Sequence, residues 1–130
     1  MEKKYLIDTN IFLEILLAQE KENICKSFLL KNISNIVISD FSFHSIGIIL
    51  YKLKKLETFL KFWRDINSIN LDILNLSFEK YPYLVEIIKK YNLDFDDAYQ
   101  ISICNEYNLT LVTLDNDFKK LKKIYNIMIL

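Results

Sequence analysis

The stretch LDFDDAYQISI places three aspartates, Asp94, Asp96 and Asp97, within four residues, directly before a helix-like segment. Like charges at this spacing repel one another, so solvent, the helix amides or a metal ion must compensate them. An acidic side chain in the first turn of a helix gains about 0.3–1 kcal/mol from the helix dipole. Helix capping accounts for one or two of the three aspartates and leaves a metal site as the competing explanation.

Two further aspartates follow short apolar runs that have the pattern of buried strands. Asp8 ends the run KYLID, and Asp115 ends the run LTLVTLD. Asp8, Thr9 or Asn10 could equally serve as the N-cap of the helix that follows. In open parallel sheets, ligands bind outside the carboxyl ends of the strands. We therefore expect Asp8, Asp97 and Asp115 to converge at one edge of a sheet.

Converging carboxylates raise one another's pKa and cost stability unless a cation balances their charge. A ligand set made only of oxygen suits Mg²⁺ or Mn²⁺, which also bind water and phosphate oxygens. Such a centre supports hydrolysis of a phosphodiester, because the ion activates water and stabilises the developing charge. The pattern of aspartates therefore favours a metal-dependent nuclease.

The elements that must position these side chains alternate between strand-like and helix-like patterns. Strands are expected at 4–8, 35–39, 71–76, 109–115 and 125–130, and helices at 10–19, 21–32, 40–56, 57–68, 77–92, 96–108 and 117–123. Near-continuous apolar strands between helices predict an α/β fold, with a mostly parallel sheet covered on both faces. A chain of 130 residues with 52% hydrophobic residues and one proline predicts a single domain over 1–130.

The composition narrows the possible functions. The formal net charge is zero, with 17 basic and 17 acidic residues, so overall charge does not favour binding to nucleic acid. The apolar runs are too short for a membrane helix, and the first residues do not have the pattern of a signal peptide. We expect a cytoplasmic protein that is not associated with membranes. Cys25 and Cys104 lie apart among apolar residues, which predicts that both pack in the core.

Three motifs, in their order and spacing, resemble the PIN domain family, and within it the VapC-type toxins of toxin–antitoxin pairs. They are YLIDTNIFLEIL, DFDDAYQISICNE and LTLVTLDNDF, and the similarity extends over essentially the whole chain. The resemblance implies a three-layer α/β/α PIN-like domain with a central sheet of about five strands. It also implies a Mg²⁺- or Mn²⁺-dependent endoribonuclease, often a homodimer, with RNA as its substrate and an antitoxin as its inhibitor.

Residue by residue, the resemblance assigns the metal-binding and catalytic positions to Asp8, Asp97 and Asp115. The supporting residues that match or lie beside the family positions are Thr9, Asn10, Asp96, Thr113 and Asp117. In this family the mid-chain helices hold an antitoxin or the dimer partner. The segment FLKFWRDI, with Phe62, Trp63 and Arg64, is the best candidate for such an exposed patch.

The chain departs from the family on the helix after the second strand, where PIN enzymes usually carry a glutamate. That stretch is VISDFSFHSIGIIL, and the expected position falls at or next to His44, the only histidine. His44 could act there as a catalytic group or ligand, which would shift the preference towards Mn²⁺. Asp40 could instead supply the carboxylate, or the protein could be a degenerate PIN module that binds RNA or a protein partner. The sequence leaves these three interpretations open.

Overall fold

The structure, a computed structural model, describes residues 3–130 and contains a five-stranded sheet. The strands are β1 (Tyr5–Ile7), β2 (Ile36–Ser39), β3 (Asp72–Leu74), β4 (Thr110–Thr113) and β5 (Ile127–Ile129). Their order is β3-β2-β1-β4-β5, and all four pairings are parallel. All five strands expected from the apolar runs are confirmed.

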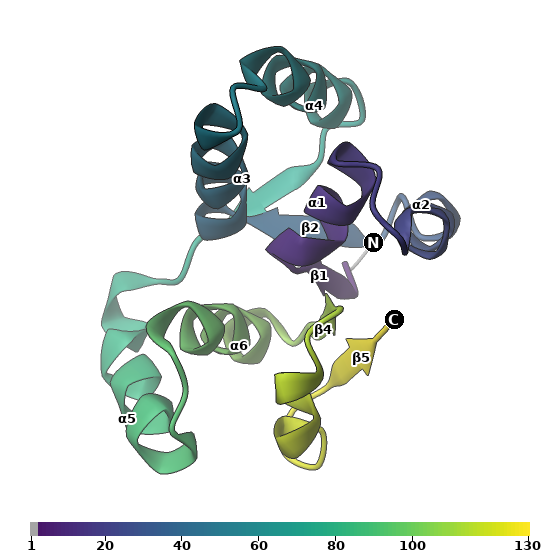
Figure 1. The fold of residues 1–130 in the computed structure, drawn as a ribbon. Helices are drawn as coiled ribbons and strands as arrows, with labels where there is room; N and C mark the ends of the chain where they lie inside the picture. The colour runs from purple at the N-terminus through teal and green to yellow at the C-terminus, as the bar shows by residue number, and fades with distance from the viewer. Residues whose placement is uncertain (1–2) are drawn as a thin grey trace.

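Helices connect the strands at the expected places (Figure 1). They are α1 (Thr9–Leu16), α2 (Glu22–Lys31), α3 (Asp40–Lys52), α4 (Leu56–Ser68), α5 (Tyr81–Tyr91) and α6 (Phe95–Tyr107), with short 3₁₀ helices η1 (Phe78–Lys80) and η2 (Asn116–Leu121). Several boundaries differ: the helix expected to reach residue 19 ends at Leu16, the one expected at 77–92 begins as the separate η1, and the helix expected to reach residue 56 ends at Lys52. Lys54 adopts a left-handed conformation with φ of 59°, and this turn separates α3 from α4.

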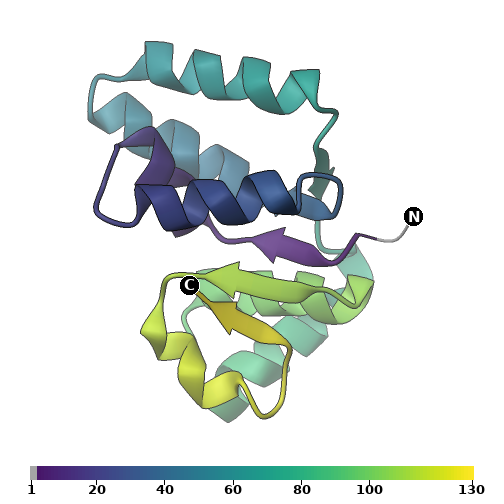
Figure 2. The ribbon, with the colours of Figure 1, turned by 90° about the vertical axis from the view of Figure 1, so that its right-hand side faces the viewer.

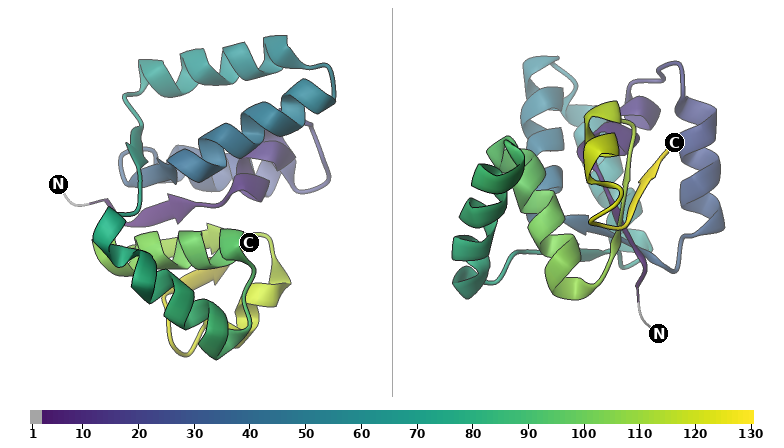
Figure 3. Two further views of the ribbon diagram at one scale, coloured as in Figure 1. Left: turned by 90° about the vertical axis from the view of Figure 1, so that its left-hand side faces the viewer. Right: turned by 90° about the horizontal axis from the view of Figure 1, so that it is seen from below.

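The alternation of side chains along the strands produces two separate cores. Leu6, Val37 and Leu111 pack on one face of the sheet against α5, α6 and η2. Ile7, Ile38 and other strand residues of opposite parity pack on the second face against α1 to α4. Figure 3 shows α3 and α4 on one side of the sheet and α5 and α6 on the other. The expected three-layer α/β/α architecture is confirmed.

The strand order creates a topological switch point between β1 and β4. The chain adds β2 and β3 on one side of β1 and then returns to place β4 on the other side, parallel to β1 (Figure 2). Open α/β sheets bind ligands at such a point, outside the carboxyl ends of the strands. Asp8 follows β1 directly and Thr113 ends β4, so the fold brings these two strand ends together.

Two expectations from the composition can be compared with this fold. Cys25 and Cys104 are both buried and unpaired, which confirms their place in the core. None of the helices within residues 3–130 combines the length and the hydropathy that a membrane span requires.

Candidate active site

Asp8 lies at the centre of a buried hydrogen-bond network at the switch point, and its exposed fraction is 9%. Oδ1 of the carboxylate accepts hydrogen bonds from the Thr9 amide at 2.9 Å and from Gln100 Nε2 at 3.1 Å. Oδ2 accepts a hydrogen bond from the Thr113 hydroxyl at 2.8 Å. Asp8 is the N-cap residue of α1 and also joins β1 to β4 and α6, so the cap and site interpretations are compatible.

The residues expected from the sequence did not include two members of this network, Ser42 and Gln100. Gln100 Nε2 and the Thr9 hydroxyl each donate to Ser42 Oγ at 2.8 Å. Both missed side chains are buried. Gln100 follows Asp97 by three residues on one helix, a spacing that places the two on the same face. The spacing from Asp97 is the feature of the sequence that points to Gln100 as a site residue. We call Asp8, Thr9, Ser42, Gln100 and Thr113 the Asp8 network.

Asn10 and Thr113 hold the loop that carries Asp115. Asn10 Nδ2 donates to Thr113 Oγ1 at 3.3 Å, and Asn10 Oδ1 accepts from the Leu114 amide at 3.2 Å. Thr113 Oγ1 also accepts from the Asp115 amide at 3.0 Å. Asp115 in turn caps η2, because its Oδ1 accepts from the Asp117 amide at 2.9 Å. Asp117 therefore lies in the first turn of η2 and is exposed, whereas Asp115 is half-buried beside the Asp8 network.

Asp97 lies half-buried in the first turn of α6. Burial raises its pKa to about 6, and repulsion from Asp8 and then Asp115 adds to the effect. Burial likewise raises the pKa of Asp8, against the hydrogen bonds from Gln100 and Thr113 that lower it. The three carboxylates therefore lie within range of one another's charge. Asp94 occupies the N-cap position of α6, although its side chain makes no capping hydrogen bond.

The structure places His44, Asp40 and Asp96 around a separate cavity of about 300 Å³, beside the Asp8 network. The Asp40 carboxylate is engaged there, since its Oδ1 accepts from the Phe41 amide and from the Tyr99 hydroxyl, both at 2.8 Å. Metal binding by His44, Asp40 or Asp96 stays a prediction. In the structure, these three residues line a cavity beside the Asp8 network.

The phase of α3 separates His44 from the Asp8 network. Successive helical residues are turned by about 100°, so His44 is turned by about 200° from Ser42. Ser45 follows Ser42 by three residues and shares its face of the helix. The α3 residue on the side of the Asp8 network is therefore Ser45, which follows His44 in the sequence and is half-buried.

The donors present suit a divalent cation that keeps part of its water shell. Within residues 3–130, no three His, Cys, Asp or Glu side chains form a preorganised metal-binding cluster. Mg²⁺ commonly binds through one or two carboxylates and retains several waters. The Asp8 carboxylate accepts three hydrogen bonds out of roughly four possible, and so retains acceptor capacity. The negative charge shared with Asp97 and Asp115 is the charge that such an ion would neutralise.

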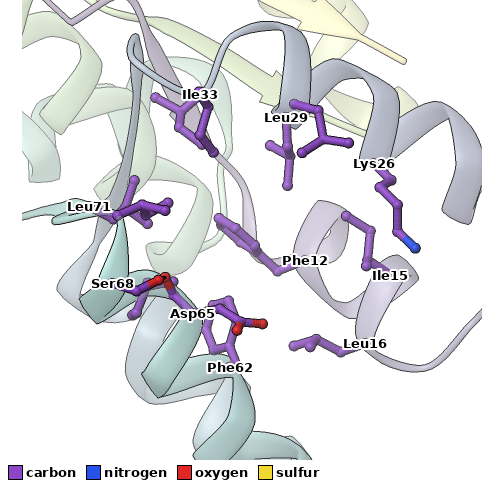
Figure 4. Close-up of a pocket in the computed structure, with 14 residues that line it drawn as sticks. Phe12, Ile15, Leu16, Lys26, Leu29, Ile33, Phe62, Asp65, Ser68 and Leu71 are labelled. Atoms are coloured by element: carbon purple, nitrogen blue, oxygen red, sulfur yellow. Dashed lines mark hydrogen bonds between the residues drawn. The ribbon is translucent and has the colours of Figure 1, made fainter.

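An apolar groove lies between α1, α2 and α4, away from these carboxylates. Its volume is about 350 Å³, and Figure 4 shows side chains such as Phe12, Leu29 and Ile33 lining it. The prediction that Phe62 belongs to an exposed patch is wrong, because it is 5% exposed and packs on Phe12 with ring centroids 5.3 Å apart. Trp63 is 46% exposed, as expected. Exposed apolar surface of this kind marks interaction sites.

Comparison with known proteins assigns the family. The family model described as the PIN domain matches residues 5–124. The chain belongs to the PIN domain family. The match includes all three motifs, from the strand before Asp8 to the loop after β4. No curated protein matches the chain at a significant level.

Solved structures share this PIN fold over almost their full length. A toxin–antitoxin complex from Klebsiella pneumoniae has a chain that is 20% identical, with a TM-score of 0.76 and 96% of each chain covered. The VapBC2 structure from Rickettsia felis, bound to a DNA fragment from its promoter, is 23% identical with a TM-score of 0.70, and covers 100% of this chain and 98% of that one. FitAcB from Neisseria gonorrhoeae is 14% identical with a TM-score of 0.69, over 95% and 96%. At these identities the likeness concerns the fold.

Proposed function

We propose that this PIN domain is a metal-dependent endoribonuclease that hydrolyses RNA phosphodiester bonds, and that it is the toxin of a type II toxin–antitoxin pair. PIN domains are generally nucleases. The observation that carries the proposal is the group of Asp8, Asp97 and Asp115 at the switch point, with the pKa of Asp97 raised by burial and by the other two carboxylates. A site that concentrates negative charge in this way is suited to a divalent ion and a phosphate.

In this proposal, Asp8, Asp97 and Asp115 hold Mg²⁺ or Mn²⁺. The bound ion would supply an activated water and a counter-charge for the phosphate. The other residues position these ligands. Thr9, Gln100 and Thr113 orient the Asp8 carboxylate through their hydrogen bonds. Such outer contacts typically change metal affinity by ~10–100-fold when they are removed.

The direct test is cleavage of a pool of structured and single-stranded RNA by the purified protein. The reaction is run with Mg²⁺, with Mn²⁺ and with EDTA, beside an Asp97→Asn protein prepared in the same way. We expect cleavage that requires metal and disappears in the variant. RNA that binds equally well with and without metal, and is never cut, would instead support a catalytically degenerate module that binds RNA or a protein partner.

The pairing of α3 with α6 predicts which position could restore the missing carboxylate. Phe41 and Tyr99 are in contact across this pair, with ring centroids 6.2 Å apart. One turn further along α3, His44 shares a cavity with Asp96, which lies one turn back along α6. The two helices therefore run antiparallel here. Ser42 contacts Gln100. Ser45, three residues further along α3, is therefore expected to lie near Asp97, three residues back along α6.

Ser45→Glu is therefore expected to tighten Mn²⁺ or Mg²⁺ binding by ~10-fold, because it adds a carboxylate beside Asp97. Isothermal titration calorimetry measures the affinity, and His44→Glu serves as the matched control. His44→Glu places the same charge on the cavity side and should change the affinity much less. A larger gain from His44→Glu would show that residue 44 is the ligand position.

The proposed partner is an antitoxin that binds the apolar groove between α1, α2 and α4 (Figure 4). The similar PIN structures from Klebsiella pneumoniae and Rickettsia felis were determined as a toxin–antitoxin complex and as VapBC2. The groove presents partly exposed Ile33 and Ile69 and is rimmed by Lys26 and Asp65, as a protein interface would be. We also propose that the protein forms a homodimer and is located in the cytoplasm.

A further inference from the structure

We propose that the cavity between α3, α5 and α6 binds an unpaired nucleobase of the substrate, adjacent to the scissile phosphate. This inference rests on the proposed nuclease function. The cavity has a volume of about 300 Å³, at the lower end of ligand pockets. Four of its lining side chains are aromatic: Phe41, Tyr81, Phe95 and Tyr99. Bases that are not paired bind proteins chiefly by stacking on such rings.

The aromatic walls are held in place by the fold. Tyr99 contacts Phe41 with ring centroids 6.2 Å apart and Tyr81 with centroids 6.4 Å apart. The Tyr99 hydroxyl donates to Asp40 Oδ1 at 2.8 Å and accepts from the Leu76 amide at 3.1 Å. These contacts fix the ring before any ligand arrives. Tyr99 is only 7% exposed, so it supports the more accessible rings of Phe41, Tyr81 and Phe95, and a cavity held in place in this way avoids part of the entropic cost of binding.

Phe95 completes the cavity from the first turn of α6 and leaves its ring available. Its exposed fraction is 56%, although it is a large apolar side chain beside a cavity. Stacking of a base on this ring would remove apolar surface from water, and any of the four bases can stack in this way. Because the ring is exposed, removing it should leave the folded core intact.

The charges around the cavity select a base over a phosphate. Asp40 and Asp96 line it together with His44. Two carboxylates repel a phosphate, whereas they accept hydrogen bonds from the amino group of a base. Asp40 Oδ1 is already occupied by Phe41 and Tyr99, which leaves Oδ2 for such a donor. Adenine, cytosine and guanine carry an exocyclic amino group with two donor hydrogens, whereas uracil has only its single N3–H to donate, so the cavity should bind uridine more weakly.

The cavity and the Asp8 network share the same two helices. On α3, Phe41 faces the cavity and the next residue, Ser42, belongs to the network. On α6, Tyr99 faces the cavity and the next residue, Gln100, donates to Asp8. A base in the cavity therefore leaves its backbone next to the carboxylates. RNA that is cut here must be single-stranded at that nucleotide.

The first test measures nucleoside binding, which needs neither metal nor cleavage. Adenosine, guanosine, cytidine and uridine are titrated into the protein in EDTA, and binding is followed by NMR shifts of the aromatic side chains. We expect binding of the three amino-bearing nucleosides, weaker binding of uridine, and a loss of at least ~5-fold in Phe95→Ala. Tyr51→Ala is the matched control, because Tyr51 is 66% exposed and lies outside the cavity lining.

A second titration, with N-acetylarginine amide, tests a guanidinium as the occupant. Binding of this compound without nucleoside binding would overturn the proposal and indicate a site for an arginine of a protein partner. No nucleoside binding, or equal binding by the Phe95→Ala and Tyr51→Ala proteins, would also overturn it. If nucleosides bind as expected but no RNA is cut, the proposed nuclease function fails and the nucleobase site stands.

Cleavage of short single-stranded RNAs provides the second readout. Substrates that differ only in the nucleotide beside one scissile bond should rank uridine last with the wild-type protein. Phe95→Ala should lower kcat/KM at least ~5-fold for the favoured bases and reduce this ranking, whereas Tyr51→Ala should preserve it. An identical ranking in both variants would contradict the proposal.

Discussion

Replacing Asp97 by asparagine is expected to abolish RNA cleavage and at the same time to stabilise the metal-free protein. Cleavage is lost because the proposed centre loses the carboxylate at the start of α6. Stability is gained because that carboxylate is held partly buried beside Asp8 and Asp115, which raises its pKa to about 6. A neutral amide of the same shape removes this repulsion. The variant should therefore lose cleavage activity while its free energy of unfolding increases.

The pH dependence follows from the direction of the pKa change. The pKa of Asp97 is raised from 3.8 to about 6 in the folded state, so between these values the folded protein binds more protons than the unfolded chain. Its contribution to stability therefore falls as pH rises through this window. At pH 7.5 the charged form is present and the repulsion is complete. Allowing for the partial exposure of the side chain, Asp97→Asn should gain about 1 kcal/mol there and little at pH 4.

Urea denaturation in EDTA at pH 4 and pH 7.5 measures this difference. Asp96→Asn is the matched control, since Asp96 is its exposed neighbour in the same helical turn. Addition of MgCl₂ or MnCl₂ should stabilise the wild-type protein much more than Asp97→Asn, because only the native site binds the ion well. Equal stabilisation of both proteins by metal, or destabilisation by Asp97→Asn at pH 7.5, would contradict the assignment of Asp97.

Replacing Gln100 by leucine is expected to have the second large effect, on both stability and metal affinity. Gln100 Nε2 donates to Asp8 Oδ1 and to Ser42 Oγ, and the side chain is 2% exposed. Leucine removes both hydrogen bonds and leaves the Asp8 carboxylate less well solvated. The expected loss of stability is about 1–3 kcal/mol. Because Asp8 becomes less well oriented, metal affinity should fall by ~10–100-fold.

The control for this variant is Ser102→Ala, two residues along the same helix. The Ser102 hydroxyl is buried without a hydrogen-bond partner within residues 3–130, so its removal should not lower stability. Denaturation at pH 5 and pH 8 adds a specific readout. The loss in Gln100→Leu should grow with pH, because the lost hydrogen bond lowered the pKa of Asp8. A loss that is equal at both pH values would indicate a packing defect alone.

The sequence determined the layers of the fold and the acidic residues of the site. Strands and helices were predictable because apolar periodicity is local, and a five-stranded sheet followed from five short apolar runs. Asp8 and Asp115 could be placed at one edge because each follows a strand, and parallel strands end on the same side. Asp97 could be added through the motif at the start of α6.

Only the tertiary structure decided how these residues are supported and which side chains surround them. Ser42 and Gln100 are uncharged residues on separate helices, and their contact at 2.8 Å depends on how α3 packs on α6. The same packing decided that His44 faces an aromatic cavity and that Ser45 shares the face of Ser42. Helix phase can be read locally, but the partner that each face meets depends on long-range packing. The proposed nucleobase site could therefore not be inferred from the sequence alone.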